Sequence, residues 1–221
     1  MDKTNHEKST VRGKIDFYHL PAKEKTAIFN QISTTSGIPP HAVEKDWWVV
    51  QTLSIIFDMD VSKYFVFKGG TSLSKGWGLI ERFSEDIDLA IDRRLFGFEG
   101  SVNRSQLVKL RKDAGRFIDD LFFSEFRKGI RDNGFEDVSV ELESGDRSDR
   151  DRSIFLHYPF VIESPGYLLP RVKIEFSCRS LMEPFTMRTF GSLVDQVYPE
   201  LGFSSAPITV PTVNPERTFL E

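Results

Sequence analysis

Several features that mark particular protein classes are scarce or absent in this sequence of 221 residues. It contains one cysteine, Cys178, which excludes an internal disulfide and a cysteine-based metal site and fits a reducing compartment. No apolar run approaches the roughly 20 residues that a membrane span needs, and the polar N-terminus lacks a signal-peptide core. These absences predict a cytoplasmic protein that has no membrane partner.

Common catalytic patterns are also missing. The histidines are scattered without metal-ligand spacing, at His6, His19, His41 and His157. No Ser-His-Asp or Cys-His arrangement is apparent, and a Walker loop of the form G-x-x-x-x-G-K-[ST] is absent, which excludes a P-loop ATPase. The net charge of −4 argues against a bulk nucleic-acid binder, so any such contact requires a local basic patch.

The most informative stretch that is present runs from residue 64 to residue 92. It predicts a short apolar strand at 64–67, a turn at Gly69-Gly70 that opens a helix at Thr71, and a second strand that begins at Asp86. The hydrophobic content of 39% suffices for one domain, or for a domain with an appendage.

The second strand places two carboxylates on one face. Successive side chains of a strand point to opposite sides, so Asp86 and Asp88 share a polar face whose reverse is apolar. Like charges at this spacing oppose joint ionisation, and a hard divalent cation such as Mg²⁺ removes that cost. The glycine turn allows a phosphate to approach the backbone closely. Together these features predict a nucleotidyl-transfer site.

The same residues carry a family resemblance. Gly-Gly-Thr followed by Asp-Ile-Asp resembles the polymerase-β-like nucleotidyltransferases. The fuller wording at 68–75 (KGGTSLSK) and 82–89 (RFSEDIDL) is similar to the AbiEii branch, the toxin component of bacterial abortive-infection toxin–antitoxin pairs. Matching stretches occur at 44–49 and 210–221, so the resemblance covers roughly residues 38–221.

This resemblance implies an α+β fold. Its polymerase-β-like nucleotidyltransferase core has a mixed or antiparallel sheet flanked by helices, with N-terminal helices and a helical C-terminal half. We therefore expect an arm at 1–19 that is flexible unless Ile15, Phe17 and Tyr18 dock it, a nucleotidyltransferase domain at 20–213, and the start of a C-terminal helical region at 214–221. Because relatives continue further, the chain is expected to be a fragment of a longer protein.

Periodicity predicts the remaining elements. Helices are expected at 21–36, from 40 to about 57, and at 103–131, and strands at 138–142, 154–158, 169–177 and 208–213. The expected buried stripe of the third helix consists of Leu107, Leu110, Ala114, Phe117, Leu121 and Phe122. Trp47 and Trp48 of the second helix are interpreted as packing residues, and Asn214 is expected to cap a short final helix.

The strand at 169–177 offers a third acid. Its apolar residues alternate with Arg171, Lys173 and Glu175. If this strand lies beside the Asp86 strand with polar faces aligned, Glu175 completes the metal site, as the family fold implies. The alternative is that Glu175 forms a salt bridge to Lys173 or Arg171.

The resemblance implies a catalytic set and a nucleotide-binding set. The metal ligands are Asp86, Asp88 and Glu175, with Mg²⁺ as the ion, Mn²⁺ as an alternative, and a nucleoside triphosphate (NTP) as substrate. The nucleotide-binding residues are Lys68, Gly69, Gly70, Thr71, Ser72, Arg82 and Ser84. Lys75 either contacts phosphate as a catalytic residue or is a solvated helix lysine. Lys45, Asp46, Glu216 and Arg217 match family motifs, and the sequence gives them no role.

Several functional alternatives stay open. The resemblance implies transfer of a nucleotide to an RNA acceptor such as a tRNA 3′ end, and relief of toxicity by a cognate antitoxin. Alternatives are a nucleotide- or RNA-sensing module, and a transferase that modifies a small molecule or a protein. Arg147, Arg150 and Arg152 either bind RNA phosphates or form a self-neutralised loop with neighbouring aspartates. The transferred base and the oligomeric state are not fixed by the sequence.

Overall fold

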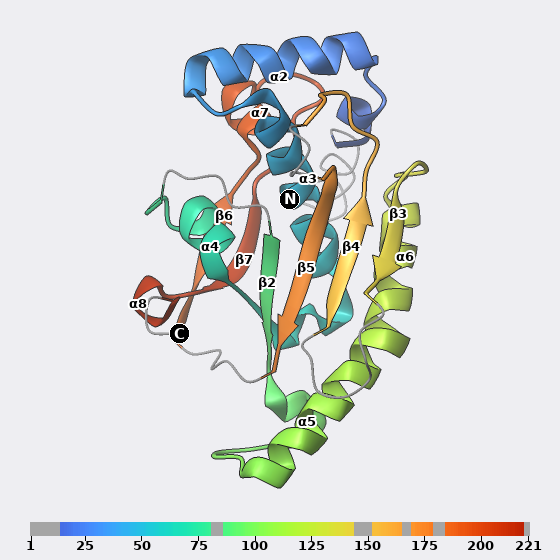
Figure 1. The fold of residues 1–221 in the computed structure, drawn as a ribbon. Helices are drawn as coiled ribbons and strands as arrows, with labels where there is room; N and C mark the ends of the chain where they lie inside the picture. The colour runs from blue at the N-terminus through green and yellow to red at the C-terminus, as the bar shows by residue number, and fades with distance from the viewer. Residues whose placement is uncertain (1–13, 81–85, 144–151, 165–168, 179–183, 219–221) are drawn as a thin grey trace, which may run out of the picture.

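A seven-stranded mixed sheet forms the centre of the molecule (Figure 1). The computed structural model describes residues 14–80, 86–143, 152–164, 169–178 and 184–218. The strands are β1 (Phe65–Lys68), β2 (Asp86–Ile91), β3 (Ser139–Leu142), β4 (Ser153–His157), β5 (Arg171–Ser177), β6 (Phe185–Phe190) and β7 (Ile208–Val213), in the order β3-β4-β5-β2-β1-β7-β6. The pairs β2/β5 and β1/β7 are parallel and the others are antiparallel, which confirms the expected α+β core.

Helices surround this sheet. The α-helices are α2 (Ala22–Ser36), α3 (Pro40–Asp58), α4 (Gly69–Thr71), α5 (Arg104–Arg116), α6 (Phe123–Asp132), α7 (Leu193–Val197) and α8 (Pro215–Thr218). The shorter helical segments are η1 (Asp60–Tyr64), η2 (Ser72–Gly76), η3 (Arg93–Phe96) and η4 (Phe117–Phe122). Predicted helices and strands agree with these bounds to within a few residues, except where noted below.

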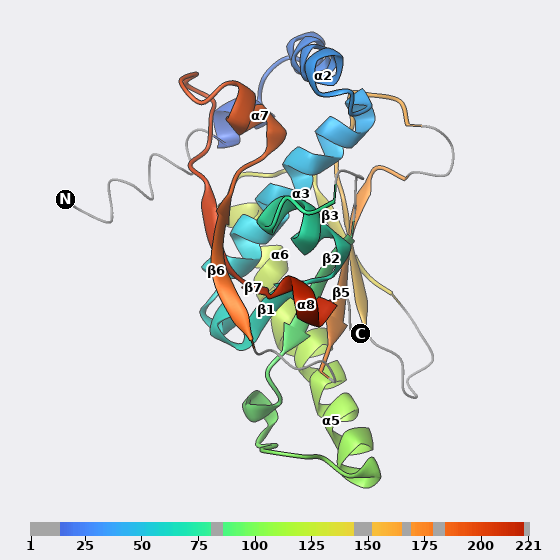
Figure 2. The same cartoon turned by 90° about the vertical axis from the view of Figure 1, so that its left-hand side faces the viewer.

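The helix α3 is the centre of the apolar core. Every residue from Ala42 to Leu53 is buried, so α3 has no solvent-exposed face along this length. It lies behind β2 and β5 in Figure 1, and Figure 2 shows it on one side of these strands. Trp47 and Trp48 are 2% and 4% exposed and pack edge to face, which confirms their interpretation as packing residues.

The predicted helix at 103–131 contains an irregularity that changes its buried face. The segment η4 is a π-helix, in which hydrogen bonds span five residues instead of four and the side-chain stripe rotates. Ile118 is therefore buried at 2% exposure, while Leu121 is 44% exposed. The expectation that Leu121 belongs to the buried stripe was wrong for this reason.

The last residues of the expected N-terminal arm are in contact with the core. Residues 14–18 are helical, and Phe17 and Tyr18 are 1% and 7% exposed. The Tyr18 hydroxyl accepts a hydrogen bond from the backbone N–H of Asp137 at 3.1 Å. For residues 14–18, the alternative in which Phe17 and Tyr18 dock the arm on the core is therefore the one found. Residues 1–13 lie outside the described part.

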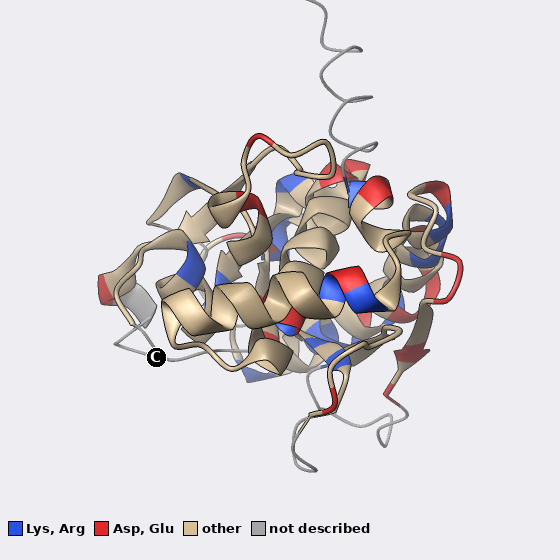
Figure 3. Ribbon diagram, turned by 90° about the horizontal axis from the view of Figure 1, so that it is seen from above, with Lys and Arg blue, Asp and Glu red and all other residues tan. Residues whose placement is uncertain are grey.

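The region between the last predicted strands holds elements that the sequence did not reveal. β6 pairs with β7 at the sheet edge, and α7 follows β6 with a capping box at Ser192. Seen from above, acidic and basic positions are interspersed over the described chain (Figure 3). Among the described residues, no helix is both long and apolar enough to cross a membrane.

Candidate active site

The glycine turn after β1 lies directly against the acidic strand. Gly69 has φ of +74°, a left-handed conformation that side chains with a Cβ rarely adopt. A Cβ at this position would lie 1.9 Å from Asp88 Oδ2. Both the conformation and the contact therefore require glycine, and the predicted phosphate turn and the predicted metal acid form one unit.

The hydroxyl groups of this turn brace its backbone. Thr71 and Ser72 are 1% and 0% exposed. Thr71 Oγ1 donates a hydrogen bond to the carbonyl of Asp86 at 2.5 Å, and Ser72 Oγ donates to the carbonyl of Gly69 at 2.8 Å. The Thr71 hydroxyl thus holds α4 against β2, and the Ser72 hydroxyl braces the turn itself. A role of these residues in nucleotide binding stays a prediction.

Strand register brings the acids together. β2 pairs in parallel with β5, and Asp88 lies opposite Glu175 while Asp86 lies opposite Lys173. The condition for Glu175 as a third acid is therefore met at the level of the backbone. The alternative is also realised, because Lys173 Nζ forms an ion pair with Glu175 Oε1.

The negative charge at Asp88 is only partly compensated. Burial and then the neighbouring charge of Glu175 raise the pKa of Asp88 to about 6, with Asp86 adding to the effect and Lys68 and Lys173 opposing it. Lys68 lies opposite Asp88 in the β1/β2 register, which places this predicted nucleotide-binding residue beside the acid.

The carboxylates of this site are suitable ligands for a divalent cation, but the described side chains do not converge on one position that the cation could occupy. Carboxylate oxygens in excess of nearby ammonium groups are the donors that Mg²⁺ prefers. Among the described residues, however, no three His, Cys, Asp or Glu side chains converge closely enough to hold a metal ion. The ion pair to Lys173 turns Glu175 toward its own strand, so the three-acid site stays a prediction.

Lys75 is neither solvated nor isolated. Its Nζ lies 2.7 Å from Asp46 Oδ1, with side-chain exposures of 11% and 6%. Asp46 Oδ2 accepts a hydrogen bond from the backbone N–H of Leu193 at 2.7 Å. Asp46 thus joins α3, η2 and α7, a positioning role that sequence reasoning missed. The available signal was a run of three charged residues within an otherwise apolar helix.

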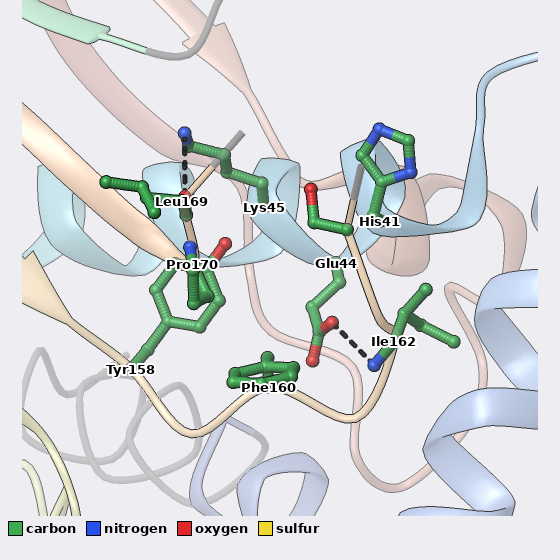
Figure 4. Close-up of a pocket in the computed structure, with 9 residues that line it drawn as sticks. His41, Glu44, Lys45, Tyr158, Phe160, Ile162, Leu169 and Pro170 are labelled. Atoms are coloured by element: carbon green, nitrogen blue, oxygen red, sulfur yellow. Dashed lines mark hydrogen bonds between the residues drawn. The ribbon is translucent and has the colours of Figure 1, made fainter. Parts of the chain in front are cut away.

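Glu44, in the same helix, supports a second loop (Figure 4). Its two carboxylate oxygens accept hydrogen bonds from the backbone N–H groups of Val161 at 2.8 Å and Ile162 at 3.1 Å. Burial outweighs these bonds and raises the pKa of Glu44 to about 7. Its neighbour Lys45 donates a long hydrogen bond of 3.5 Å to the carbonyl of Leu169.

Of the remaining candidate residues from the sequence, the structure describes the side chains of Arg152 and Glu216 only. Arg152 donates two hydrogen bonds of 3.1 Å to the carboxylate of Asp119 on η4, so it is anchored to the protein. Glu216 lies exposed in the first turn of α8. Arg82, Ser84, Arg147 and Arg150 lie outside the described residues, and so does the side chain of Arg217.

Comparison with known proteins identifies the family. The model of the nucleotidyl transferase AbiEii toxin of type IV toxin–antitoxin systems matches residues 53–221. No curated protein matches the sequence. Among solved structures, MenT4, a nucleotidyltransferase toxin from Mycobacterium tuberculosis, is similar at 19% identity with a TM-score of 0.47, and the match covers 86% of this chain and 56% of that toxin. Since the family model accounts for the turn, the acidic strand and β5, the chain belongs to the AbiEii nucleotidyltransferase toxin family.

Proposed function

We propose that this protein transfers a nucleoside monophosphate from an NTP to a hydroxyl group at an RNA 3′ end, such as that of a tRNA. The observation that carries the proposal is the contact between the glycine turn and the acidic strand. Asp88 lies so close to Gly69 that a side chain at position 69 would collide with its carboxylate. In a bound NTP, the phosphates would lie on this turn and the cation on the carboxylate pair. Both would then be next to the α-phosphorus.

The residues would divide the work as follows. Asp86 and Asp88 would hold Mg²⁺, and the ion would supply charge neutralisation on the triphosphate and favour ionisation of the attacking hydroxyl. The backbone of Gly69 and Gly70 orients the β and γ phosphates, and Lys68 adds positive charge beside them. Glu175 would accept the proton of the acceptor hydroxyl as its oxygen attacks the α-phosphorus, and the bond to pyrophosphate, the leaving group, would break.

The pairing of Lys75 with Asp46 supports a positioning role for both residues. η2 follows the glycine turn directly, so an anchor at Lys75 fixes the turn against α3 and α7. A contact of Lys75 with phosphate would require it to leave a buried carboxylate, which is costly. We therefore propose that Lys75 acts mainly through the position of the turn.

The biological role proposed is that of a toxin with a cognate antitoxin, acting in the cytoplasm where NTPs and RNA are present. Expression of the full gene product is expected to arrest growth, and co-expression of the antitoxin to restore it. Asp86→Ala should abolish the arrest while the protein level is unchanged.

The decisive assay uses the full gene product with Mg²⁺, total bacterial RNA and each α-labelled NTP in turn, alongside Asp86→Ala. Label on RNA with the wild type alone is the expected result, and the productive NTP defines the base preference. Label on protein or on a small molecule would show that the acceptor is that molecule and not RNA. Tight nucleotide binding without transfer to any acceptor would support the sensing module instead.

A further inference from the structure

The open face of the sheet continues well beyond the acid pair. On β5 the side chains alternate between buried and partly exposed, and the partly exposed set is Arg171, Lys173, Glu175 and Ser177. These lie on the same face as Asp86 and Asp88, because directly paired residues of neighbouring strands point to the same side. Within the described chain, no helix lies over β3, β4 and β5 on this side (Figures 1 and 2).

An aromatic ring is set into this charged face. Phe155 of β4 pairs with Lys173 and is therefore directed to the open side, yet it is only 7% exposed. Arg171 covers it, with the guanidinium carbon 3.9 Å from the ring centroid. At this distance the guanidinium lies in contact with the ring, and Arg171 as a whole is partly exposed.

The guanidinium of Arg171 has no anionic partner among the described residues. On this face Lys173 forms an ion pair with Glu175, and His157 Nε2 lies within hydrogen-bond distance of Glu141 Oε2, at 3.0 Å. Arg171 lies opposite His157 in the strand register, between these two pairs and outside both. A half-exposed cation that rests on an aromatic ring beside two satisfied pairs is a preformed stacking surface for a planar group.

The spacing along β5 relates this surface to the reaction site. Glu175, Lys173 and Arg171 are two residues apart in succession, about 7 Å per step at 3.3 Å per residue. If the 3′ hydroxyl of a nucleic-acid strand lies at Glu175, the strand would pass Lys173. A nucleotide upstream of the 3′ end would then contact Arg171. A small acceptor bound at Glu175 would not extend that far.

We propose that Arg171, supported by Phe155, is a base-stacking platform that positions a single-stranded RNA acceptor upstream of its reactive 3′ end. This inference rests on the proposed function and adds to it the residue that selects a polynucleotide over a single nucleotide as acceptor. Stacking on a guanidinium plane tolerates any base, so the platform favours single strands with little sequence preference.

Direct binding tests the platform without relying on catalysis. Short 3′-terminal RNA oligonucleotides with a 5′ fluorophore are titrated with wild type, Arg171→Ala, Arg171→Lys and Arg127→Ala, and anisotropy is recorded. Stacking energies predict that Kd rises about 10- to 100-fold in Arg171→Ala and similarly in Arg171→Lys, which keeps the charge and loses the plane. Arg127 is the matched control, because it lies 5.7 Å from the Phe123 ring on α6, and its variant should bind like the wild type.

A modified oligonucleotide locates the contact. Replacing one upstream nucleotide by an abasic residue should weaken binding to the wild type. It should have no effect on binding to Arg171→Ala, because that variant has already lost the guanidinium on which the base stacks. Equal Kd values for wild type and Arg171→Ala, or no RNA binding by the wild type, would overturn the platform.

Kinetics separate failure of the platform from failure of the proposed function. With an active wild type, Arg171→Ala should raise KM for RNA by the same factor while KM for the NTP and kcat at saturating RNA stay unchanged. An unchanged KM for RNA would remove the platform and leave the transferase in place. RNA binding that depends on Arg171 without nucleotide transfer by the wild type would remove the transferase and leave the platform.

Discussion

The two faces of β2 and β5 differ completely although their residues alternate along the same strands. On the covered face, Ile87, Leu89 and Ile174 are 0% exposed and pack against the core around α3. On the open face, Asp86, Asp88 and Glu175 crowd negative charge against the glycine turn. One face therefore contributes stability, and we propose that the other contributes chemistry. A shift of the strand by one residue would exchange the two faces.

Neighbouring residues of β2 allow the sharpest test of this division. Asp88→Asn should reduce nucleotide transfer by at least about 1,000-fold, because a ligand that stabilises several kcal/mol of developing charge is lost. Its free energy of unfolding at pH 8 should not fall, since the buried charge itself is unfavourable there. Ile87→Ala should instead lose about 2–5 kcal/mol of unfolding free energy.

Urea denaturation and the transfer assay measure both quantities for each variant. If Asp88→Asn were as unstable as Ile87→Ala, the open face would be structural and the division would fail.

A pair of glycines with the same backbone angle sharpens the comparison. Gly69 and Gly37 both have φ of +74°, but a Cβ on Gly37 would have no atom within 4 Å, while one on Gly69 would collide with Asp88. Each alanine variant should lose about 1–2 kcal/mol of stability from the left-handed backbone. Gly69→Ala alone should also lose about 100-fold or more in transfer, since displacement of a reacting group by about 1 Å has that effect.

Thermal unfolding and initial rates of the two variants decide this point. Equal activity in Gly69→Ala and Gly37→Ala would show that the turn and the acid work separately.

Glu44 is an exception to the division between an apolar covered face and a charged open face, because its carboxyl group lies on the covered side of the sheet. Burial raises its pKa in the folded protein to about 7, above the value of 4.5 in the unfolded chain, so folding favours its protonated form. Its contribution to stability is therefore fully present below pH 4.5 and decreases as the pH rises toward 7. The stability advantage of the wild type over Glu44→Gln should shrink by about 2 kcal/mol between pH 5 and 6.5.

Chemical denaturation of both proteins across this pH range provides the measurement. Parallel curves for the two proteins would mean that Glu44 titrates normally and that the loop at Val161 and Ile162 does not depend on its charge.

Local patterns sufficed for the strands that carry the site. Alternation in β2 and β5 predicted which residues share a face, and the family wording placed the glycine turn before them. The close contact of Gly69 with Asp88 and the pairing of Lys75 with Asp46 depend on tertiary positions, which no local period encodes. Such contacts between distant segments are the part of the site that the sequence left unpredicted.

Two further differences have identifiable physical causes. The π-helical turn of η4 rotates the side-chain stripe, so a regular period assigns Leu121 to the wrong side. The residues of β6 are mostly exposed at a sheet edge. Apolar and polar residues alternate only over the first four positions, a run too short to distinguish a strand from the surrounding loops.

The most direct test of the central claim follows the phosphorus atoms. The full gene product is incubated with RNA, Mg²⁺ and one productive NTP labelled either at the α or at the γ phosphorus, with Asp88→Asn in parallel. The account predicts that α label becomes attached to the RNA, that γ label is released as pyrophosphate, and that Asp88→Asn yields neither product. Attachment of γ label, or release of free phosphate without transfer, would contradict it.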